Sequence, residues 1–458
     1  MASNSPGTEG SLDLNEAIDG QQLGWRSAPL ICIAVLVLLC DGFDLAAMGY
    51  IVPELVKAWQ LEPARFVSAF SAGIIGMMIG GPLLGLLGDR LGRRRVIVLG
   101  LLAIGLATLA TMAAQTVTHL VILRFLTGIG LGGVVPNVAA LIAELSPKRL
   151  RGRMLVIVTL GMPLGIALPG LVAGLLVPAF GWPGILLVGG LLPLGVALAA
   201  QAGVPESPKF LVEIGGRVEE ARQTIRHLRP DLVIGDDTRI IVAARNQVRG
   251  SAGQMFAGSL AIATPLLWIC QAANQMANFF SLTWLPTLLQ SAGATTAQAG
   301  GHASLFALGG LGAGVVLIFV IDRLGVIPLV LMFVVGVPLV AQMSSADLGP
   351  VAHRLVIAGA GLCVTGINFG LTALLPIFYP TSIRSLGTGW TQAFGRVGAL
   401  AAPLVGGYLM QQNIPTSQLS MAPAILLAVG AVASMVLAWL CIRQFGGTRV
   451  AEFGESRA

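Results

Sequence analysis

Long apolar segments recur along the whole chain and constrain its fold more than any other feature. A helix needs roughly 20 apolar residues to cross a lipid bilayer. Only 10% of the 458 residues are charged and 55% are hydrophobic, whereas a soluble domain carries about 25% charged residues. Most of the surface must therefore face lipid. The twelve predicted spans are 28–51, 66–88, 96–114, 119–143, 154–177, 183–204, 260–289, 301–321, 326–345, 351–378, 386–410 and 419–442.

The basic residues predict the orientation of an all-α membrane protein. If the N-terminus is cytoplasmic, the cytoplasmic segments hold 22 of the 27 lysines and arginines, and the outer loops hold three. Lysine and arginine concentrate in cytoplasmic loops, so we expect both termini in the cytoplasm. Because these residues are spread over several loops, the net charge of +6 reflects orientation, and no nucleic-acid partner is expected.

The predicted spans divide into two halves of six. An offset of 233 residues maps the sequence DRLG from Asp89–Gly92 onto Asp322–Gly325, and it maps Asp41 onto Asn274. Parallel repeats of six spans are typical of secondary transporters, which bind substrate near the midplane between the repeats. The predicted parts are a cytoplasmic tail (1–25), an N-terminal half (26–204), a cytoplasmic loop (205–257), a C-terminal half (258–443) and a cytoplasmic tail (444–458).

Several motifs carry a resemblance to a known family. GLLGDRLGRRR begins at Gly85, RFLTGIGLGG at Arg124 and VPESPKFL at Val204. Together they resemble the major facilitator superfamily over nearly the whole chain. DGFD at Asp41, RFLTGIGLGGVVPN in the fourth span, and FYPTSIRSLGTGW with GRVGA are similar to the aromatic acid:proton symporter family. This resemblance implies proton-coupled uptake of a small aromatic carboxylate of the benzoate, hydroxybenzoate or hydroxyphenylpropionate class.

Two acidic residues lie within the first predicted span. Their spacing of three places Asp41 and Asp44 on one helix face. Ionised carboxylates are costly in lipid, so we expect both to face a watery cleft or to bind protons. Neighbouring carboxylates resist joint ionisation, which suits a carrier of protons. The alternative is that they cap a kinked helix or pair structurally with a neighbouring span.

Two arginines also lie within predicted spans. Arg396, near the middle of the eleventh span, stays charged and needs an anion. Either a substrate carboxylate binds it through two hydrogen bonds, or Asp41 forms a permanent salt bridge with it. For Arg124, nearer the outer face, the sequence favours a structural or coupling role over substrate binding. Asn137, in the same span, is assigned to the same structural or coupling group.

A stripe of amides marks one face of the seventh predicted span. Such side chains either hydrogen-bond a ring hydroxyl or carboxylate, or they hold helices together. Aromatic residues near the amides and near Arg396 suit an aromatic ring. With Arg396, the predicted substrate site comprises Gln271, Asn274, Gln275, Asn278, Phe279 and Trp390.

The loop after the second predicted span is the expected conformational gate. Its glycines allow close helix packing, and Asp89 is able to pair with a basic group. Membrane orientation alone would account for the arginines but not for the aspartate and the glycines. Glu144 either joins this cluster or caps its own helix. The predicted gate residues are Gly85, Asp89, Arg90, Gly92, Arg93, Arg94, Glu144, Asp322 and Arg323.

The residues favour a transporter over an enzyme. The sequence holds no phosphate-binding loop, metal-ligand cluster or nucleophile–base pair, so we expect no metal and no cofactor besides the coupling proton. We predict a multi-pass protein of the bacterial inner membrane that contacts lipid, imports an aromatic carboxylate with protons and works as a monomer. The alternatives are a proton-coupled exporter or a sugar-type porter of the same fold, and a sensor of aromatic acids.

Overall fold

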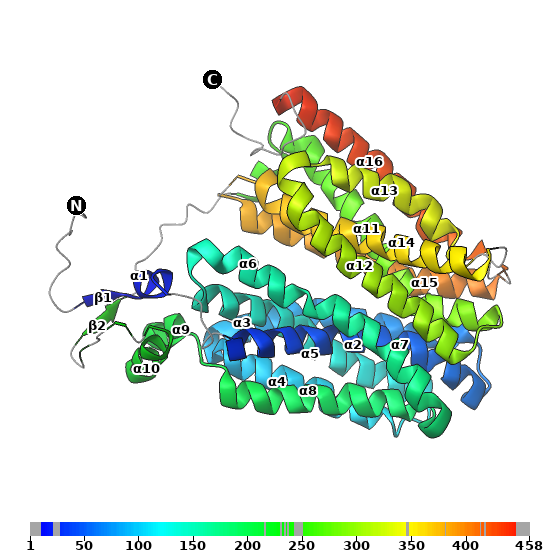
Figure 1. The fold of residues 1–458 in the computed structure, drawn as a ribbon, viewed down its shortest axis with the longest axis horizontal. Coiled ribbons are helices and arrows are strands. Elements are labelled where there is room, and N and C mark those ends of the chain that lie inside the picture. Colours follow the sequence, from blue (N-terminus) through cyan, green and yellow to red (C-terminus); the bar gives the residue numbers. More distant parts are fainter. Residues whose placement is uncertain are drawn as a thin grey trace.

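The chain folds into two helical bundles that lie side by side, with a small module at one end (Figure 1). The computed structural model describes residues 11–21, 28–214, 217–229, 231–232, 235, 238–241, 251–344, 348–380, 382–412, 414–415 and 418–445.

The first bundle contains seven α-helices and a 3₁₀ turn, and the second contains six α-helices after a second 3₁₀ turn. The first comprises α2 (Ala28–Trp59), η2 (Pro63–Phe66), α3 (Val67–Leu91), α4 (Arg93–Thr111), α5 (Val117–Leu145), α6 (Lys148–Thr159), α7 (Gly161–Phe180) and α8 (Pro183–Gly203). The second comprises η3 (Ala252–Phe256), α11 (Leu260–Ser291), α12 (Thr296–Leu324), α13 (Ile327–Ala341), α14 (Pro350–Phe378), α15 (Arg384–Gln411) and α16 (Met421–Phe445).

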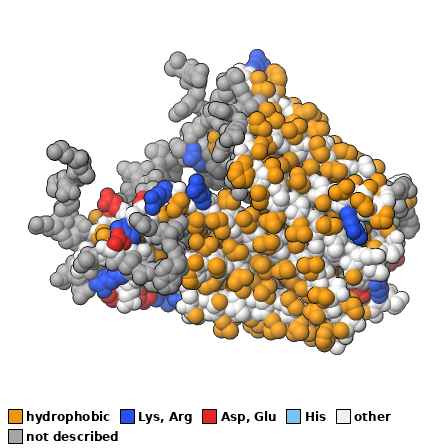
Figure 2. Space-filling model, in the orientation of Figure 1, with side chains coloured by type: hydrophobic (Ala, Val, Ile, Leu, Met, Phe, Trp, Pro, Cys, Tyr) orange, Lys and Arg blue, Asp and Glu red, His pale blue; other side chains and the backbone are white. Residues whose placement is uncertain are grey.

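The helices have the length and apolar character of membrane spans. Within the described ranges, ten segments are long and apolar enough to cross a bilayer, one of them running through α6 and α7, and α13 is a shorter apolar helix. The 32-residue α11 is not among the ten, and its middle carries the four predicted amides. On the face shown in Figure 2, hydrophobic side chains cover both bundles, while many of the charged ones gather at the end near α9 and α10. This surface confirms the predicted all-α membrane fold.

The predicted repeat is visible in the packing of each bundle. Helix α14 occupies the residues of α5 shifted by 233. In both bundles, glycines at equivalent positions touch the backbone of a neighbouring helix, so that a Cβ would collide with a carbonyl oxygen. The equivalent pairs are Gly128–Gly73 and Gly361–Phe306, Gly76–Phe125 and Gly309–Ala358, and Gly165–Leu39 and Gly398–Ala272. The two halves therefore repeat one set of close helix contacts.

The bundles meet at one end, which we call the closed end, and diverge toward the other, which we call the open end (Figure 1). There the backbones of Gly170 in α7 and Gly300 in α12 touch. The Thr296 hydroxyl donates a hydrogen bond of 2.8 Å to Glu54, and Lys57 Nζ donates one of 3.1 Å to Gln290 Oε1. Lys57 and Gln290 are themselves 233 residues apart, so these equivalent positions meet at the approximate two-fold axis that relates the bundles.

A small module packs on the open end of the first bundle. It joins β1 (Ser11–Asp13) and α1 (Leu14–Asp19) to α9 (Pro208–Ile214), α10 (Val218–Leu228) and β2 (Arg239–Ile241). The two strands pair in parallel. Apolar side chains from both parts of the chain share one core, made by Leu14, Ala17, Ile18, Phe210, Leu211, Ala221, Ile225 and Ile240. The predicted tail and the predicted inter-half loop therefore fold together.

Alanine at Gly300 should weaken the closed end. Its Cβ would collide with the carbonyl oxygen of Gly170, and overpacking of this kind costs about 1–3 kcal/mol. The neighbouring Gly301→Ala is a matched control, because a Cβ there meets no atom within 4 Å. We expect a lower thermal unfolding midpoint in detergent for Gly300→Ala only. Equal midpoints for the two variants would contradict this packing.

Candidate functional site

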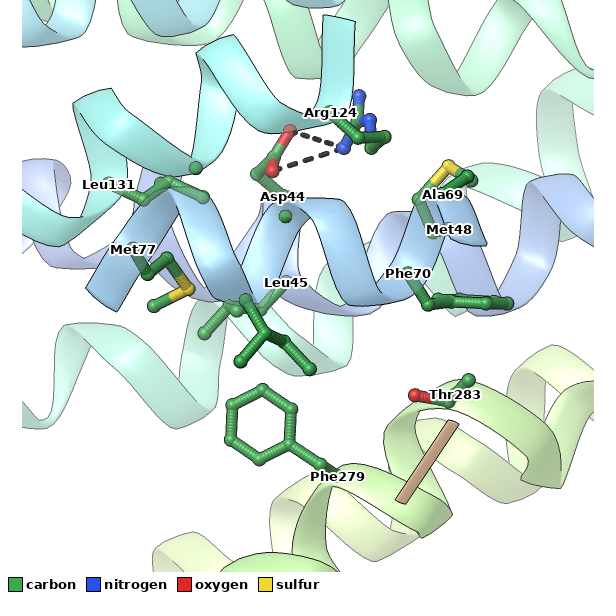
Figure 3. A pocket seen from close by; sticks show the side chains of 13 residues that line it. Asp44, Leu45, Met48, Ala69, Phe70, Met77, Arg124, Leu131, Phe279 and Thr283 are labelled. Atoms are coloured by element: carbon green, nitrogen blue, oxygen red, sulfur yellow. Dashed lines mark hydrogen bonds and ion pairs between the residues drawn. The ribbon is translucent and has the colours of Figure 1, made fainter. Parts of the chain in front are cut away.

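A small cavity lies between the bundles, beside the helix contacts of the closed end (Figure 3). Helices α2, α3 and α5 supply most of its wall, and α11 of the other bundle supplies Phe279 and Thr283. Asp44 and Arg124 form its charged part, and Phe70 contributes an aromatic side chain. The volume of about 50 Å³ has room for a few water molecules.

Asp44 and Arg124 form a buried ion pair in this cavity. Arg124 Nη1 lies 3.1 Å from each carboxylate oxygen of Asp44, and the Thr108 hydroxyl donates a hydrogen bond of 3.3 Å to the same carboxylate. The two charged residues are only 5% and 3% exposed. Each buried charge depends on the other, so the structure brings these two predicted residues together. The sequence analysis missed Thr108, which carries no charge.

Asp41 lies one turn before Asp44 and is also buried, at 2% exposed. Its Oδ1 atom has no hydrogen-bond partner among the residues that the structure describes. It interacts electrostatically with Arg396 of α15, in the other bundle. Within the described part of the chain the two residues form no ion pair at 4.0 Å or less. Asp41 and Arg396 therefore interact between the bundles as separated charges.

The amides of α11 pack against α15 next to Arg396. Gln271 Nε2 donates a hydrogen bond of 3.1 Å to Gln392 Oε1. A Cβ on Gly395 would lie 2.8 Å from the side chain of Gln271 and 3.2 Å from that of Gln275. Asn274 is completely buried, and neither of its amide atoms has a partner in the described ranges. The sequence analysis missed Gln392, although it lies one helical turn before Arg396.

The remaining predicted substrate residues are divided between two surfaces. Phe279 lines the cavity, and its neighbour Asn278 is half-buried. Trp390 instead shares an exposed stripe of α15 with Val397 and Tyr408, whose exposed fractions are 47%, 57% and 61% in that order. It packs near Trp268, with ring centroids 6.3 Å apart. This placement favours lipid contact and aromatic packing over substrate contact for Trp390.

The predicted gate forms a polar cluster at the open end of the first bundle. Asp89 pairs with Arg93, and Glu144 lies 3.9 Å from the same arginine. Asn137 Oδ1 accepts a hydrogen bond of 3.5 Å from Arg93 Nη1, and its amide nitrogen donates to the carbonyl oxygen of Leu84 at 3.0 Å. Arg93 therefore connects residues of α3, α4 and α5.

Glu206 belongs to this cluster, although the sequence analysis assigned it no role. Its carboxylate accepts a hydrogen bond of 3.1 Å from the Arg94 backbone N–H, while the Arg94 side chain donates to the carbonyl oxygen of Gln201. Gly92 adopts a positive φ of 99°, and a Cβ there would collide with Glu206. The motif VPESPKFL therefore supplies a carboxylate that holds the loop between α3 and α4.

Other predicted gate residues lie in open surroundings or outside the residues that the structure describes. A Cβ on Gly85 would meet no atom within 4 Å, whereas Gly88, absent from the prediction, touches Asn137. Arg90 is exposed. The side chains of Asp322 and Arg323, at the end of α12, lie outside the described residues, as do residues 446–458 of the predicted C-terminal tail.

The family model described as Major Facilitator Superfamily matches residues 34–376. The chain belongs to this superfamily. As a superfamily member it is a multi-pass transporter of the bacterial inner membrane and not an enzyme, as predicted. Among the described residues, no group of three or more histidines, cysteines and acids is arranged to hold a metal ion.

Known relatives cover nearly the whole chain. The 4-hydroxybenzoate transporter PcaK of Pseudomonas putida is 33% identical over 94% of this chain and 97% of its own. A gallate transporter of Pseudomonas putida is 31% identical over 89% of this chain and 91% of its own. The solved structure of the xylose transporter XylE from E. coli, in a partially occluded inward-open conformation, has a TM-score of 0.67 and 18% identity, covering 88% and 97% of the two chains. These matches extend the superfamily fold over both bundles.

Alanine at Gly92 should destabilise the gate loop, and alanine at Gly85 should not. A non-glycine residue in a sparsely populated backbone conformation costs about 1–3 kcal/mol, and the new Cβ would also displace Glu206. Thermal unfolding in detergent would measure both variants. A Gly92→Ala protein as stable as Gly85→Ala would show that the loop has no such constraint.

Removal of either partner of the Asp44–Arg124 pair should be more costly than removal of both. A single alanine leaves an uncompensated buried charge, at a cost of about 3–5 kcal/mol. We expect the double variant to lose less stability than the sum of the two single variants, in a double-mutant cycle followed by unfolding. The exposed Lys209–Glu213 pair, at 3.8 Å, is the control and should show almost no coupling. Additive effects at Asp44 and Arg124 would contradict the buried pair.

Proposed function

We propose that this protein imports a small aromatic carboxylate together with protons by alternating access. The observation that carries the proposal is the buried Asp41, which interacts electrostatically with Arg396 of the other bundle and has an oxygen without a partner among the described residues. The substrate class is supported by the relatives named as 4-hydroxybenzoate and gallate transporters.

Proton and substrate exchange at Arg396 is the proposed coupling step. Arg396 keeps its charge, and ionised Asp41 is the acid that interacts with it electrostatically. When Asp41 takes a proton, Arg396 loses this counter-charge and binds the substrate carboxylate through charge-assisted hydrogen bonds. Release of that carboxylate and of the Asp41 proton on the inner side restores the interaction between Arg396 and ionised Asp41. No metal or other cofactor takes part, and the proton is the coupling ion.

The amides beside Arg396 would orient the aromatic ring. Gln271 and Gln275 lie against the same segment of α15, and buried amide atoms without partners favour binding of a polar group. A ring hydroxyl is such a group, and Phe279 offers an aromatic surface. The proposed contacts from α11 are Gln271, Asn274, Gln275, Asn278 and Phe279, while Trp390 supports the packing of α15 from outside.

The proposed topology has twelve spans and both termini in the cytoplasm. Helices α11 and α13 complete the count, with α6 and α7 forming one span. The module built from residues 11–21 and part of 205–257 lies with most of the basic residues, which favours the cytoplasmic side for it. The closed end then faces outward, and the bundles diverge toward the cytoplasm. The chain would function as a monomer, because two six-span halves form one complete pathway.

The gate would act at the cytoplasmic end of this pathway. In the present conformation Arg93 contacts both Asp89 and Glu144 within the first bundle. We propose that they, with Arg90 and Arg94, meet the end of α12 at Asp322 and Arg323 when the bundles close on the cytoplasmic side. Gly92 and Gly325, at equivalent positions in the two loops, both adopt positive φ angles.

Uptake into proteoliposomes tests the proposal. With an inward proton gradient we expect at least one labelled acid from a panel of benzoate, hydroxybenzoates, gallate and hydroxyphenylpropionate to accumulate, while xylose does not. Asp41→Asn should lose gradient-driven accumulation by tenfold or more, because it cannot exchange a proton. Arg396→Ala should raise the KM by a similar factor, and Arg354→Ala, an exposed residue outside the site, should behave like the unchanged protein.

Other outcomes would favour the alternatives. Accumulation of xylose would favour a sugar-type porter, and outward movement against the substrate gradient would favour an exporter. Binding of an aromatic acid without any movement would favour a sensor. Undiminished proton coupling in Asp41→Asn would show that Asp41 is not the coupling residue.

A further inference from the structure

We infer that Arg124 carries a second carboxylate-binding edge, which takes the aromatic acid near the closed end before the acid reaches Arg396. The inference rests on the proposed function, because it assigns a further contact to the same substrate. Sequence reasoning favoured only a structural or coupling role for this arginine.

The unused donors of Arg124 are the first observation. Its Nη1 atom makes both contacts with Asp44. Its Nε and Nη2 atoms are buried and have no hydrogen-bond partner among the described residues. Those two N–H groups form one side of the planar guanidinium fork, which matches the two oxygens of a carboxylate. Buried donors without acceptors are rare in proteins, so this edge is suited to a ligand.

A cavity lies beside the Arg124–Asp44 pair. Arg124 and Asp44 line it together (Figure 3). Its volume of about 50 Å³ fits a carboxylate-sized group but not a complete aromatic ring. Phe279 and Thr283 close it from α11, which belongs to the other bundle. Movement of that bundle away from α3 would therefore open room for the ring, with Phe70 and Phe279 available for aromatic contacts.

The charges in the cavity set the order of binding. Ionised Asp44 already balances Arg124, so a second carboxylate would place two anions on one guanidinium. A proton on Asp44 removes that conflict and leaves the positive charge to the substrate. Asp44 would therefore bind its proton before the acid binds at Arg124. The acid would then pass from Arg124 in the first bundle to Arg396 in the second.

Two substitutions with opposite expected effects test the inference. Arg124→Lys keeps a positive charge for Asp44 but loses the planar fork, so we expect 4-hydroxybenzoate to bind at least tenfold more weakly. The preference of this variant for 4-hydroxybenzoate over the uncharged 4-hydroxybenzamide should fall as well. Asp44→Asn removes the competing carboxylate, so binding should stay as tight or become tighter, with less dependence on pH. Equilibrium binding to the purified protein in detergent from pH 5 to pH 8 measures each of these.

The controls separate this inference from a structural role and from the proposed function. Arg354→Lys should leave binding unchanged, and unfolding midpoints report whether each variant is folded. If Arg124 only stabilises the bundle by pairing with Asp44, both substitutions should weaken binding alike, and the inference is overturned. Unchanged affinity and carboxylate preference in a folded Arg124→Lys protein also overturn it. If Arg124→Lys does not fold, the Asp44→Asn result decides. If the unchanged protein binds no aromatic acid, the proposed function fails together with the inference.

Discussion

Buried charge between two apolar bundles is the constraint on which the structure depends. In a protein surrounded by lipid, an ionised group is tolerated only where it faces a partner, water or a ligand. Asp44 and Arg124 satisfy this requirement within the first bundle, whereas Asp41 and Arg396 satisfy it only across the interface. The first pair joins helices of one bundle, and the second joins the two bundles.

The duplicated packing explains how the bundles are able to move without losing their own structure. Within each bundle, glycines bring neighbouring backbones into contact at equivalent places, such as Gly128 and Gly361. Between the bundles, the contacts at the closed end include a few hydrogen bonds, among them that of Thr296 with Glu54. A rigid interior joined through a hydrogen-bonded surface favours motion of whole bundles over motion of single helices.

The sequence predicted an all-helical membrane fold, because apolar length is visible in one dimension. It also predicted that Asp89 is able to pair with a basic group, and Asp89 lies against Arg93. It did not predict the hydrogen bond from the Arg94 backbone to Glu206, or the one from Gln271 to Gln392. Each of these contacts joins residues far apart in the chain. Trp390 was assigned to the substrate from its proximity to Arg396 in sequence, but a shift of six residues on a helix changes the face. Thr108 was missed because hydroxyl groups are common in apolar helices.

The pairing of β1 with β2 has a consequence for how the chain is assembled. Ser11–Asp13 are made before the first bundle, and their strand partners, Arg239–Ile241, are made after it. The strand pair therefore forms only after the whole first bundle has been made, and it brings the two ends of that bundle together. These partners are also made before the second bundle. The order of events during translation therefore favours completion of one half before the other half competes for its helices.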